Sequence, residues 1–338
     1  MSLHVGVDVG GTKVLAGVLD ADGRVVRTAL RSTPGRRVSP GMVEDALTEA
    51  VAEVADGRTP DAVGLAAAGF VDVDRERVMF APHLPWAGEP VRARLEDRWG
   101  VRVVLDNDAN CAAVAESRLG AARGATSALV LTLGTGIGGA LVLDGHVLRG
   151  AQGMAGEFGH MQVVPDGRGC ECGRSGCWEQ YCSGNALLRF ARARVGVEPT
   201  MLTDLCGGRP ERLTGPQVTD AAEDGDLVAR QAFASVGESL GRGLAALVAA
   251  FDPEVVVVGG GVSAAGDRLL DPARAALARH LVGADHRVLP PVRVGLGADA
   301  GLVGAALLAE EASAPGGAQM RAPSSNGSRG SRGIRATR

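Results

Sequence analysis

The feature that most constrains the fold is a pattern that occurs twice along the chain. The first copy, LHVGVDVGGTKVLAGVLDADGRVVRTAL at residues 3–30, gives a strand, a Gly/Thr turn, a strand, an Asp-Gly turn and a third strand. The second copy, SALVLTLGTGIGGALVLDGHVLRG at residues 127–150, repeats that order. Two β-hairpins could resemble each other by chance, but shared order, loop chemistry and spacing favour an internal duplication. The duplication predicts two similar α/β domains facing across a central cleft, each contributing one glycine loop.

The first glycine loop, DVGGTK at residues 8–13, is joined directly to a second strand. Dinucleotide-binding and P-loop folds instead place a helix immediately after their glycine loop. The sequence therefore predicts a phosphate loop within a hairpin and excludes a Walker motif.

The segments between and after the two copies alternate helix and strand patterns. Strands are predicted at residues 62–69, 101–106 and 254–261. Helices are predicted at residues 43–55, 90–99, 109–120, 186–195, 227–251, 272–281 and 300–311. From residue 313 onward the chain lacks apolar periodicity, so an Arg/Ser/Gly-rich disordered tail is expected there.

Charge and hydropathy narrow the possible partners. The net charge is −4, and the five arginines of residues 313–338 make the remaining body more acidic still. An acidic body argues against nucleic acid as the main partner. The longest apolar run, LVLTLGTGIGGALVL, is shorter than the roughly 20 residues of a membrane span and is interrupted by glycines. The N-terminus shows no signal peptide, so no membrane partner and a cytoplasmic location are expected.

Six motifs in order give the chain a family resemblance. They are DVGGTK, DNDAN (106–110), LGTGIGG (133–139), EFGH (157–160), CECGRSGCWE (170–179) and VVVVGGGVS (255–263). Together they resemble the ROK family of bacterial sugar kinases, and within it the ATP-dependent glucokinases, from about residue 5 to residue 310. The resemblance implies an α/β, actin-like or ribonuclease-H-like fold of two duplicated domains.

The predicted domain division follows from the same resemblance. Residues 1–118 and 298–312 would form a smaller N-terminal α/β domain, to which the C-terminal helix returns. Residues 119–297 would form a larger α/β domain carrying the cysteine-rich loop. Related proteins are commonly dimers or tetramers, so a homo-oligomer is expected by kinship.

Phosphoryl transfer requires amide donors and cations near the phosphates, and two loops offer them. The turn amides come from Gly10, Gly11 and Thr12 in the first copy, and from Gly134, Thr135, Gly136 and Gly138 in the second. Asp8, at the end of the preceding strand, is placed to hold Mg²⁺ directly or through water. The alternative is that both loops are plain hairpin turns.

Lys13 is the single lysine among 35 basic residues. A compact ammonium suits a tight turn beside a triphosphate better than a planar guanidinium does. Since related kinases vary at this position, two interpretations stay open: a phosphate contact, or an exposed strand residue.

The junction of the strand at 101–106 with the following helix is the predicted reaction centre. By resemblance, Asp108 is the general base toward the sugar hydroxymethyl group, and Asn107 binds ring hydroxyls. A carboxylate within hydrogen-bond reach of the attacking hydroxyl is what this chemistry needs. Alternatively, either residue is only a helix N-cap, for which Asn and Asp are preferred.

The cysteine loop predicts a structural zinc site. Cys170, Cys172 and Cys177, with His160, supply three thiolates and one imidazole for a closed tetrahedral site. One nitrogen of His160 would bind zinc, and the resemblance suggests that the other meets the sugar. By the same resemblance Glu157 and Glu179 belong to the sugar site, the alternative being solvated loop charges.

Three positions depart from the usual family pattern. Ala68 replaces a common proline before Gly69, whose bare backbone is expected to approach the sugar. His83 stands where relatives usually carry asparagine, and Asp106 where glutamate is commoner. These changes leave the choice of sugar open.

The end of the strand at 254–261 carries three further candidates. Gly259, Gly260 and Gly261 are an adenosine contact by family inference, or otherwise a tight strand-to-helix turn.

The sequence thus favours an ATP-dependent hexose kinase, with glucose converted to glucose 6-phosphate, catalytic Mg²⁺ and structural Zn²⁺. Fructose, N-acetylmannosamine or N-acetylglucosamine are alternative substrates, and polyphosphate is an alternative donor. A different class, the sugar-sensing regulators of the same family, carries a helix-turn-helix domain before the phosphate loop. Here the loop begins at residue 8, which favours the kinase.

Overall fold

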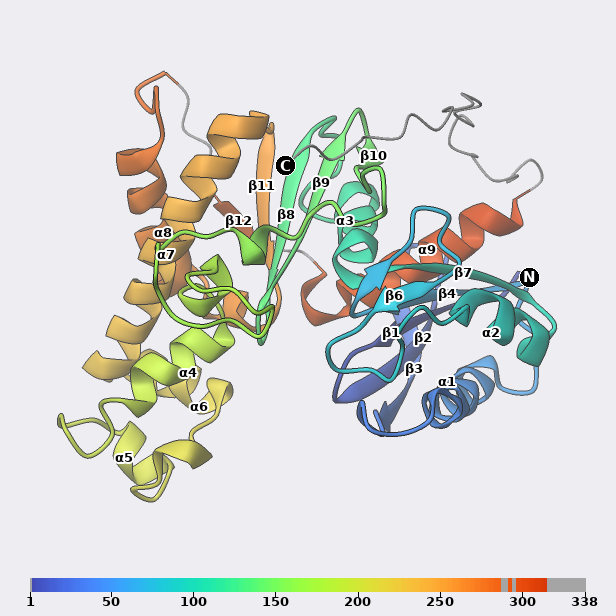
Figure 1. The fold of residues 1–338 in the computed structure, drawn as a ribbon, viewed down its shortest axis with the longest axis horizontal. Helices are drawn as coiled ribbons and strands as arrows, with labels where there is room; N and C mark the ends of the chain where they lie inside the picture. Colours follow the sequence, from blue (N-terminus) through green and yellow to red (C-terminus); the bar gives the residue numbers. More distant parts are fainter. Residues whose placement is uncertain (1, 287–290, 294–295, 315–338) are drawn as a thin grey trace, which may run out of the picture.

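The computed structural model describes residues 2–286, 291–293 and 296–314, and most of its strands lie in two five-stranded sheets (Figure 1). The first sheet has the order β3-β2-β1-β4-β7, formed by β1 (His4–Val9), β2 (Lys13–Leu19), β3 (Val25–Ser32), β4 (Ala62–Ala67) and β7 (Arg102–Asn107). The second has the order β10-β9-β8-β11-β12, formed by β8 (Ala128–Leu133), β9 (Ile137–Leu143), β10 (His146–Val147), β11 (Val255–Gly259) and β12 (Pro291–Arg293).

The two sheets have the same topology. In the first, β1, β2 and β3 pair antiparallel, whereas β4 and β7 continue the sheet in parallel from β1. In the second, β8, β9 and β10 pair antiparallel, and β11 and β12 continue in parallel from β8. The duplication predicted from the sequence is therefore confirmed, strand for strand.

Helices α1 (Pro40–Ala55) and α9 (Ala300–Ser313) both pack on the first sheet. Small residues allow α9 a close approach: a Cβ at Gly6 would lie 2.1 Å from the Leu302 carbonyl oxygen, and one at Gly64 would lie 1.9 Å from that of Ala305. The last helix of the described residues thereby covers β1. Helix α2 (Val91–Trp99) packs beside β7.

The second half has three helices without a counterpart in the first, namely α4 (Gly184–Arg192), α5 (Leu202–Leu205) and α6 (Gly215–Glu223). Helices α7 (Leu227–Phe251) and α8 (Asp267–His280) lie before and after β11 in the chain, as α1 and α2 lie before and after β4. Along α7, Phe233, Leu240 and Leu244 recur at helical spacing, and each is fully buried in the largest apolar cluster of the described residues. The fully buried Trp178, which follows Cys177, belongs to the same cluster and anchors the end of the cysteine loop in this core.

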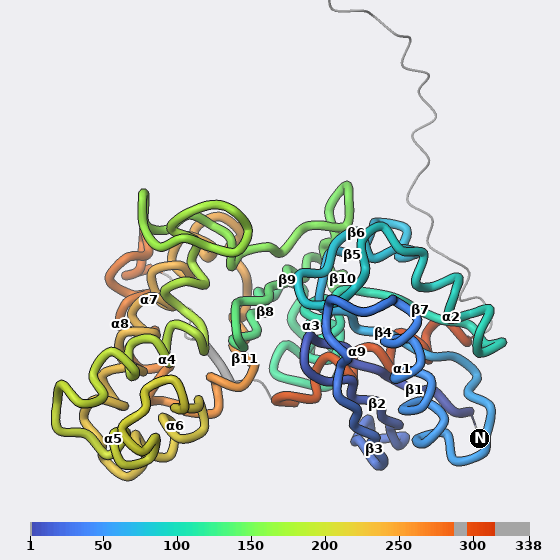
Figure 2. Tube along the Cα trace, turned by 60° about the horizontal axis from the view of Figure 1, so that its bottom comes forward, coloured from blue at the N-terminus to red at the C-terminus, as the bar shows by residue number. Residues whose placement is uncertain are grey.

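Helix α3 (Asp108–Arg118) connects the two halves. It packs against β4, β7 and α9 on one side and against β8 and β9 on the other. A Cβ at Gly304 of α9 would lie 1.7 Å from the Cys111 carbonyl oxygen, so the two helices cross at backbone contact. Figures 1 and 2 show α3 between the two sheets. Its first residue, Asp108, consequently lies where the halves meet.

Most sequence-predicted elements are present, with a few differences. Helix α8 begins at Asp267, five residues before its predicted start at Pro272, because Gly266 (φ 62°) forms the turn that opens the helix. The hairpin of β5 (Phe70–Val71) and β6 (Val78–Phe80) was not predicted, nor were α5, α6 and β12. Short 3₁₀ helices add η1 (Phe158–His160), η2 (Trp178–Gln180), η3 (Pro210–Arg212), η4 (Gly261–Ala265) and η5 (Gly297–Asp299).

Two predictions concern the ends of the domains. Ser313, the first residue of the predicted tail, is the last residue of α9, and residues 315–338 lie outside the described part. The domain boundaries after residues 118 and 297 stay a prediction. Within the described ranges, no helix is long and apolar enough to cross a membrane.

Candidate active site

Asp8 lies near the end of β1, at the edge of the sheet where β4 and β7 also end. Its pKa is raised to about 7, first by burial and then by the nearby charge of Asp108, and Asp299 adds to the rise. Lys13 opposes the shift. Since an ionised carboxylate is costly in this acidic setting, a divalent cation would bind Asp8 favourably. The donor chemistry therefore fits the predicted Mg²⁺.

The first glycine loop is a tight hairpin turn. The Gly10 N–H donates to the Lys13 carbonyl oxygen at 2.9 Å, and the Thr33 hydroxyl donates to the Gly10 carbonyl oxygen at 2.7 Å. A Cβ at Gly11 would lie 2.4 Å from that of His83, so the loop bearing His83 packs on this turn. Thr12 and Lys13 are exposed at its tip. The geometry keeps both interpretations of Lys13 open, although its effect on Asp8 places its charge near the site.

At the start of α3, Asn107 acts as the N-cap. Its Oδ1 accepts from the backbone N–H of Ala109 (2.9 Å) and of Asn110 (3.1 Å), and its Nδ2 donates to the Gly69 carbonyl oxygen at 3.0 Å. Asn107 thus makes the cap that sequence reasoning offered as the alternative to sugar binding. The cap also fixes its side chain beside Asp108.

Asp108 is the first residue of α3, where the helix dipole favours a negative charge. Burial nevertheless raises the pKa of its carboxyl group, while hydrogen bonds from the backbone oppose the rise. The charge of Asp108 raises the pKa of both Asp8 and Glu157, so Asp108 lies near the first phosphate loop and near a residue of the predicted sugar site.

Gly69 has a structural reason to be glycine. A Cβ there would lie 2.7 Å from the Phe80 carbonyl oxygen and 2.9 Å from the Cβ of Ala81. The close approach is thus to the end of β6, while the carbonyl of Gly69 is bound by Asn107. The predicted contact of Gly69 with sugar stays a prediction.

The second glycine loop lies against the cysteine loop. The Gly134 N–H donates to the Gly136 carbonyl oxygen at 3.1 Å, and Gly184 donates to the Gly134 carbonyl oxygen at 2.8 Å. A Cβ at Gly136 would lie 2.4 Å from Glu179 Oε2. Gly134 and Thr135 are exposed. The structure therefore brings a predicted phosphate loop into contact with Glu179, which was predicted to bind the sugar.

The three glycines at the end of β11 adjoin this second loop. Gly260 has φ 79°, and a Cβ there would lie 2.5 Å from the Leu133 carbonyl oxygen, so a side chain is excluded. Gly259 ends the strand and Gly261 begins η4. A cavity of about 590 Å³ lies at the end of η4 and the start of α8, lined by Glu223, Arg230, Ala264, Ala265, Gly266, Asp267, Arg268 and Asp271.

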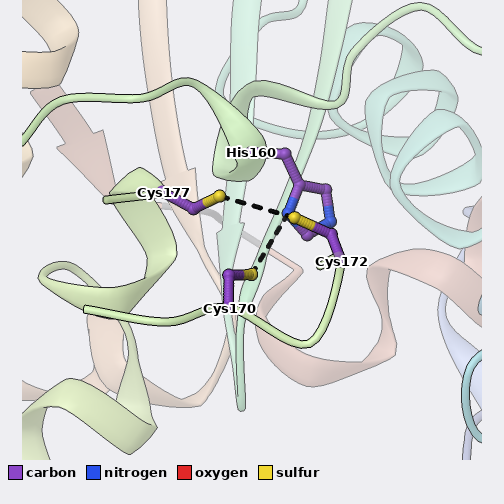
Figure 3. Close-up of side chains that lie close together, drawn as sticks. All are labelled: His160, Cys170, Cys172 and Cys177. Carbon is purple, nitrogen blue, oxygen red and sulfur yellow. Dashed lines mark hydrogen bonds between the residues drawn. The ribbon is translucent and has the colours of Figure 1, made fainter. Parts of the chain in front are cut away.

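His160 and the three cysteines form a compact donor cluster, in which all four ligand atoms lie within 4.8 Å of one another (Figure 3). Cys170 Sγ is 3.7 Å from His160 Nδ1, and the sulfurs of Cys172 and Cys177 are 3.5 Å apart. A tetrahedral zinc ion holds sulfur and nitrogen ligands about 3.5–3.8 Å apart. The donor set is that of a structural Zn²⁺ site, and these two distances match the spacing that the ion requires.

The two nitrogens of His160 face different partners. Nδ1 faces the sulfurs, whereas Nε2 is 3.9 Å from Glu157 Oε2. Glu179 Oε1 is 3.1 Å from Cys170 Sγ and 3.7 Å from His160 Nδ1. The pKa of Glu157 is raised to about 7 by desolvation, with further contributions from Asp108 and Glu179. The imidazole thus links the donor cluster to the acidic centre.

Sequence reasoning missed two contributors to this region. Asp299 acts on Asp8 from the turn before α9, and a Cβ at Gly301 would lie only 3.4 Å from the Asp8 carboxylate. The predicted return of the C-terminal helix was the signal that could have found Asp299. Arg149 contacts Asp106 from the other half of the chain, and no sequence signal pointed to it.

Residues 4–312 match the profile of the ROK family. The chain belongs to this family.

Similarity within the ROK family is extensive. The glucokinase of Streptomyces coelicolor is 43% identical over 92% of this chain and 98% of its own length. The glucokinase of Thermotoga maritima is 35% identical over 91% of this chain and 97% of its own length. A crystal structure of a ROK family glucokinase from Streptomyces griseus, in complex with glucose and AMPPNP, is 44% identical. It covers 92% of this chain and 100% of its own, with a TM-score of 0.85. The predicted family and the actin-like two-domain fold are confirmed.

Proposed function

We propose that this ROK protein is a glucokinase that transfers the γ-phosphoryl group of ATP to the 6-hydroxyl of glucose. The observation that carries the proposal is its likeness, along nearly the whole chain, to a glucokinase crystallised with glucose and AMPPNP. The arrangement of acids around the start of α3 supports it independently.

Asp108 is proposed as the general base. As the glucose hydroxyl attacks the γ-phosphorus, its proton passes to the Asp108 carboxylate, and ADP leaves as the phosphoryl group is transferred. The raised pKa of Asp108 makes it a better proton acceptor than an exposed aspartate, provided that it is ionised. Asn107, held by its cap and by Gly69, would present the remaining polar edge to the ring hydroxyls.

The glycine loops are proposed to receive the phosphates. The amide groups of Gly10, Gly11 and Thr12 would act from one side, and those of Gly134, Thr135 and Gly136 from the other. Asp8 would hold Mg²⁺, which neutralises charge on the phosphates when bound. Gly259 to Gly261 and the cavity at the start of α8 would receive the adenosine.

The cysteine loop is proposed to shape the sugar site. Zn²⁺ on His160, Cys170, Cys172 and Cys177 would fix the loop, as structural zinc does elsewhere. His160 Nε2 would then donate to a sugar hydroxyl, with Glu157 and Glu179 accepting from its neighbours. In this arrangement the metal organises the pocket and takes no part in the transfer.

The first test is ADP release in the presence of Mg²⁺ across a panel of hexoses. Glucose is expected to give the highest kcat/KM, and ADP release is expected to require added sugar. Fructose, N-acetylmannosamine or N-acetylglucosamine as the best substrate would transfer the assignment to another hexose kinase, and polyphosphate replacing ATP would change the donor.

The second test concerns the base. Asp108→Asn is expected to lower kcat roughly 10²–10⁴-fold, because the proton acceptor is lost, while glucose still binds. Asp97→Asn, at an exposed position on α2, is the matched control and should retain wild-type kcat. An Asp108→Asn enzyme with full turnover would overturn the assignment.

Assembly and location remain proposals by kinship. We infer a homo-oligomer in the cytoplasm, and light scattering of the purified chain tests the assembly: a single monomeric species would overturn it.

A further inference from the structure

Asp106 carries a buried carboxylate immediately before the proposed sugar-binding and catalytic residues. It is 1% exposed. Its Oδ1 accepts from the backbone N–H of Asn107 at 2.9 Å and from Asn110 Nδ2 at 3.0 Å. Its Oδ2 accepts from Arg149 Nε at 2.9 Å and Arg149 Nη2 at 2.5 Å. Each oxygen therefore has two donors, and the carboxylate is held from both sides.

Arg149 reaches Asp106 from the second half of the chain. It follows β10, and its side chain is only 23% exposed. Its carbonyl oxygen accepts from the Ala155 N–H at 3.0 Å, so Arg149 also closes the loop that leads to Glu157. One residue thus connects the start of α3 with the segment that carries a proposed sugar ligand.

The β5–β6 hairpin brings a third segment to the same place. Arg75, which has a left-handed backbone (φ 56°), places Nη1 3.9 Å from Asp106 Oδ2. A Cβ at Gly153 would lie 2.2 Å from the Val71 carbonyl oxygen, so the loop of Arg149 packs directly on this hairpin. Burial lowers the pKa of Arg75, and the Arg149 charge adds to that effect. Two guanidinium groups share one carboxylate here, which makes the junction sensitive to the loss of either partner.

The position of this network gives it more than a stabilising role. Asp106 binds the amide of Asn107, Asn107 caps α3, and Asp108 is the first residue of that helix. Rotation of the Asp106 carboxylate would therefore move the cap and the proposed base together. A guanidinium that donates two bonds in a fixed plane resists that rotation better than a single ammonium.

We propose that Arg149 is a positioning residue for phosphoryl transfer, acting through Asp106 to hold Asp108 in register with the loop of Glu157. The inference rests on the proposed kinase function. Neither Arg149 nor Asp106 needs to contact sugar or nucleotide in this role. The pair instead fixes, across the two halves, the position of Asp108 relative to the loop that carries Glu157.

The test compares Arg149→Met, Arg149→Lys, Asp106→Asn and the double variant Asp106→Asn/Arg149→Met. Arg149→Met is expected to lower kcat with the preferred hexose roughly 10–100-fold, because small displacements of a base are costly. The KM for ATP should stay within about twofold of wild type, since the phosphate loops are untouched. Arg149→Lys should recover part of kcat, and the double variant should be no slower than the slower single one.

Arg118→Met is the matched control. Arg118 lies at the other end of α3 and pairs with Glu311 at 2.5 Å. Its loss removes an ion pair from the same helix without touching Asp106, so kcat should change less than about twofold. Wild-type kcat in Arg149→Met, additive losses in the double variant, or an equal loss in Arg118→Met would overturn the proposal. Should Arg149→Met not fold, Arg149→Lys decides: a several-fold lower kcat at an unchanged melting temperature supports the role, and wild-type kcat contradicts it.

A readout that needs no substrate separates this inference from the kinase assignment. Hydrogen–deuterium exchange over residues 103–112 should be faster in Arg149→Met than in wild type or Arg118→Met, because the Asn107 amide loses its fixed acceptor. Unchanged exchange would overturn the positioning role of the Asp106–Arg149 pair even in an active kinase. A wild-type chain that phosphorylates no hexose would overturn the proposed function instead.

Discussion

The two halves of the molecule share one sheet topology but carry different groups at equivalent positions. Asp8 is the fifth residue of the six-residue strand β1, and Thr132 is the fifth residue of the six-residue strand β8. The turn after β1 is followed by Lys13, whereas the turn after β8 is followed by Ile137. The first half therefore brings ionisable groups to its loop, and the second half brings a neutral one.

The same contrast holds for the segments that follow the hairpins. The first half passes from β3 directly toward α1, whereas the second half inserts the cysteine loop between β10 and α4. An acid also stands at the start of the helix that follows the last strand of each sheet, because Asp108 is the first residue of α3 and Asp299 is the N-cap residue of α9. The duplicated sheets thus supply two similar glycine turns. The side chains at matching positions differ, and so do the roles proposed for them.

The largest difference between the two halves should come from removing the polar group at each of the matching strand positions. Asp8→Asn is expected to lower kcat roughly 10²–10³-fold, because the proposed Mg²⁺ loses its carboxylate. Thr132→Val, at the matching position, should lower kcat less than about tenfold, because a neutral hydroxyl binds Mg²⁺ weakly. Steady-state kinetics at several Mg²⁺ concentrations measure both. Equal losses in the two variants would show that the halves do not differ as described.

A smaller effect is expected from loss of the Zn²⁺ proposed for the second half. Cys172→Ser should raise the KM for glucose roughly 10–100-fold and leave the KM for ATP nearly unchanged. The reason is that the cysteine loop carries or adjoins the side chains proposed to bind glucose. Zinc content by atomic absorption and the melting temperature should fall together. An enzyme that keeps its KM for glucose after complete metal removal would contradict the role of the loop.

The pH dependence of kcat/KM and of the free energy of unfolding tests the role proposed for Asp108. Because the pKa of Asp108 is raised above 3.8, kcat/KM should fall as the pH drops through that raised value. The folded carboxyl then binds its proton more tightly than the unfolded one, so this group lowers the free energy of unfolding as the pH rises through the same range. Asp108→Asn should remove that part of the pH dependence of stability. A wild-type slope retained in the variant would contradict the assignment.

Two glycines of the second half should respond differently to alanine. Gly260→Ala is expected to lower the free energy of unfolding by roughly 1–3 kcal/mol, because its φ is 79° and the Leu133 carbonyl lies in the way. Gly134→Ala meets nothing within 4 Å, so its stability should change by less than about 0.5 kcal/mol. It should instead raise the KM for ATP. Denaturant unfolding and kinetics distinguish the two, and equal destabilisation would contradict the description of this loop.

The smallest expected effect concerns Lys13. Since its side chain is exposed, Lys13→Met should raise the KM for ATP only about two- to tenfold, with kcat nearly unchanged. An unchanged KM at low salt would favour the interpretation as an accidental strand residue.

The sequence predicted the helices and strands better than the tertiary contacts between them. The repeated hairpins, the helix at Leu227–Phe251 and the cluster of one histidine and three cysteines followed from local patterns, because periodicity and spacing report local structure. The hairpin of β5 and β6 was missed because its strands have only two and three residues. The packing of His83 on Gly11 depends on tertiary approach, which no local pattern records.

The neighbours of Asp106 illustrate the same limit. Its departure from the family pattern was visible, but its partner Arg149 is 43 residues away and lies in the other half. Only the folded chain places that guanidinium beside the start of α3.

A crystal structure of this chain with glucose and a non-hydrolysable ATP analogue tests the central claim most directly. We expect the glucose 6-hydroxyl about 2.6–3.2 Å from the Asp108 carboxylate, with the terminal phosphate between the loops at Gly10–Thr12 and Gly134–Gly136. Glucose bound away from Asp108, or a triphosphate held by only one of the two loops, would contradict it.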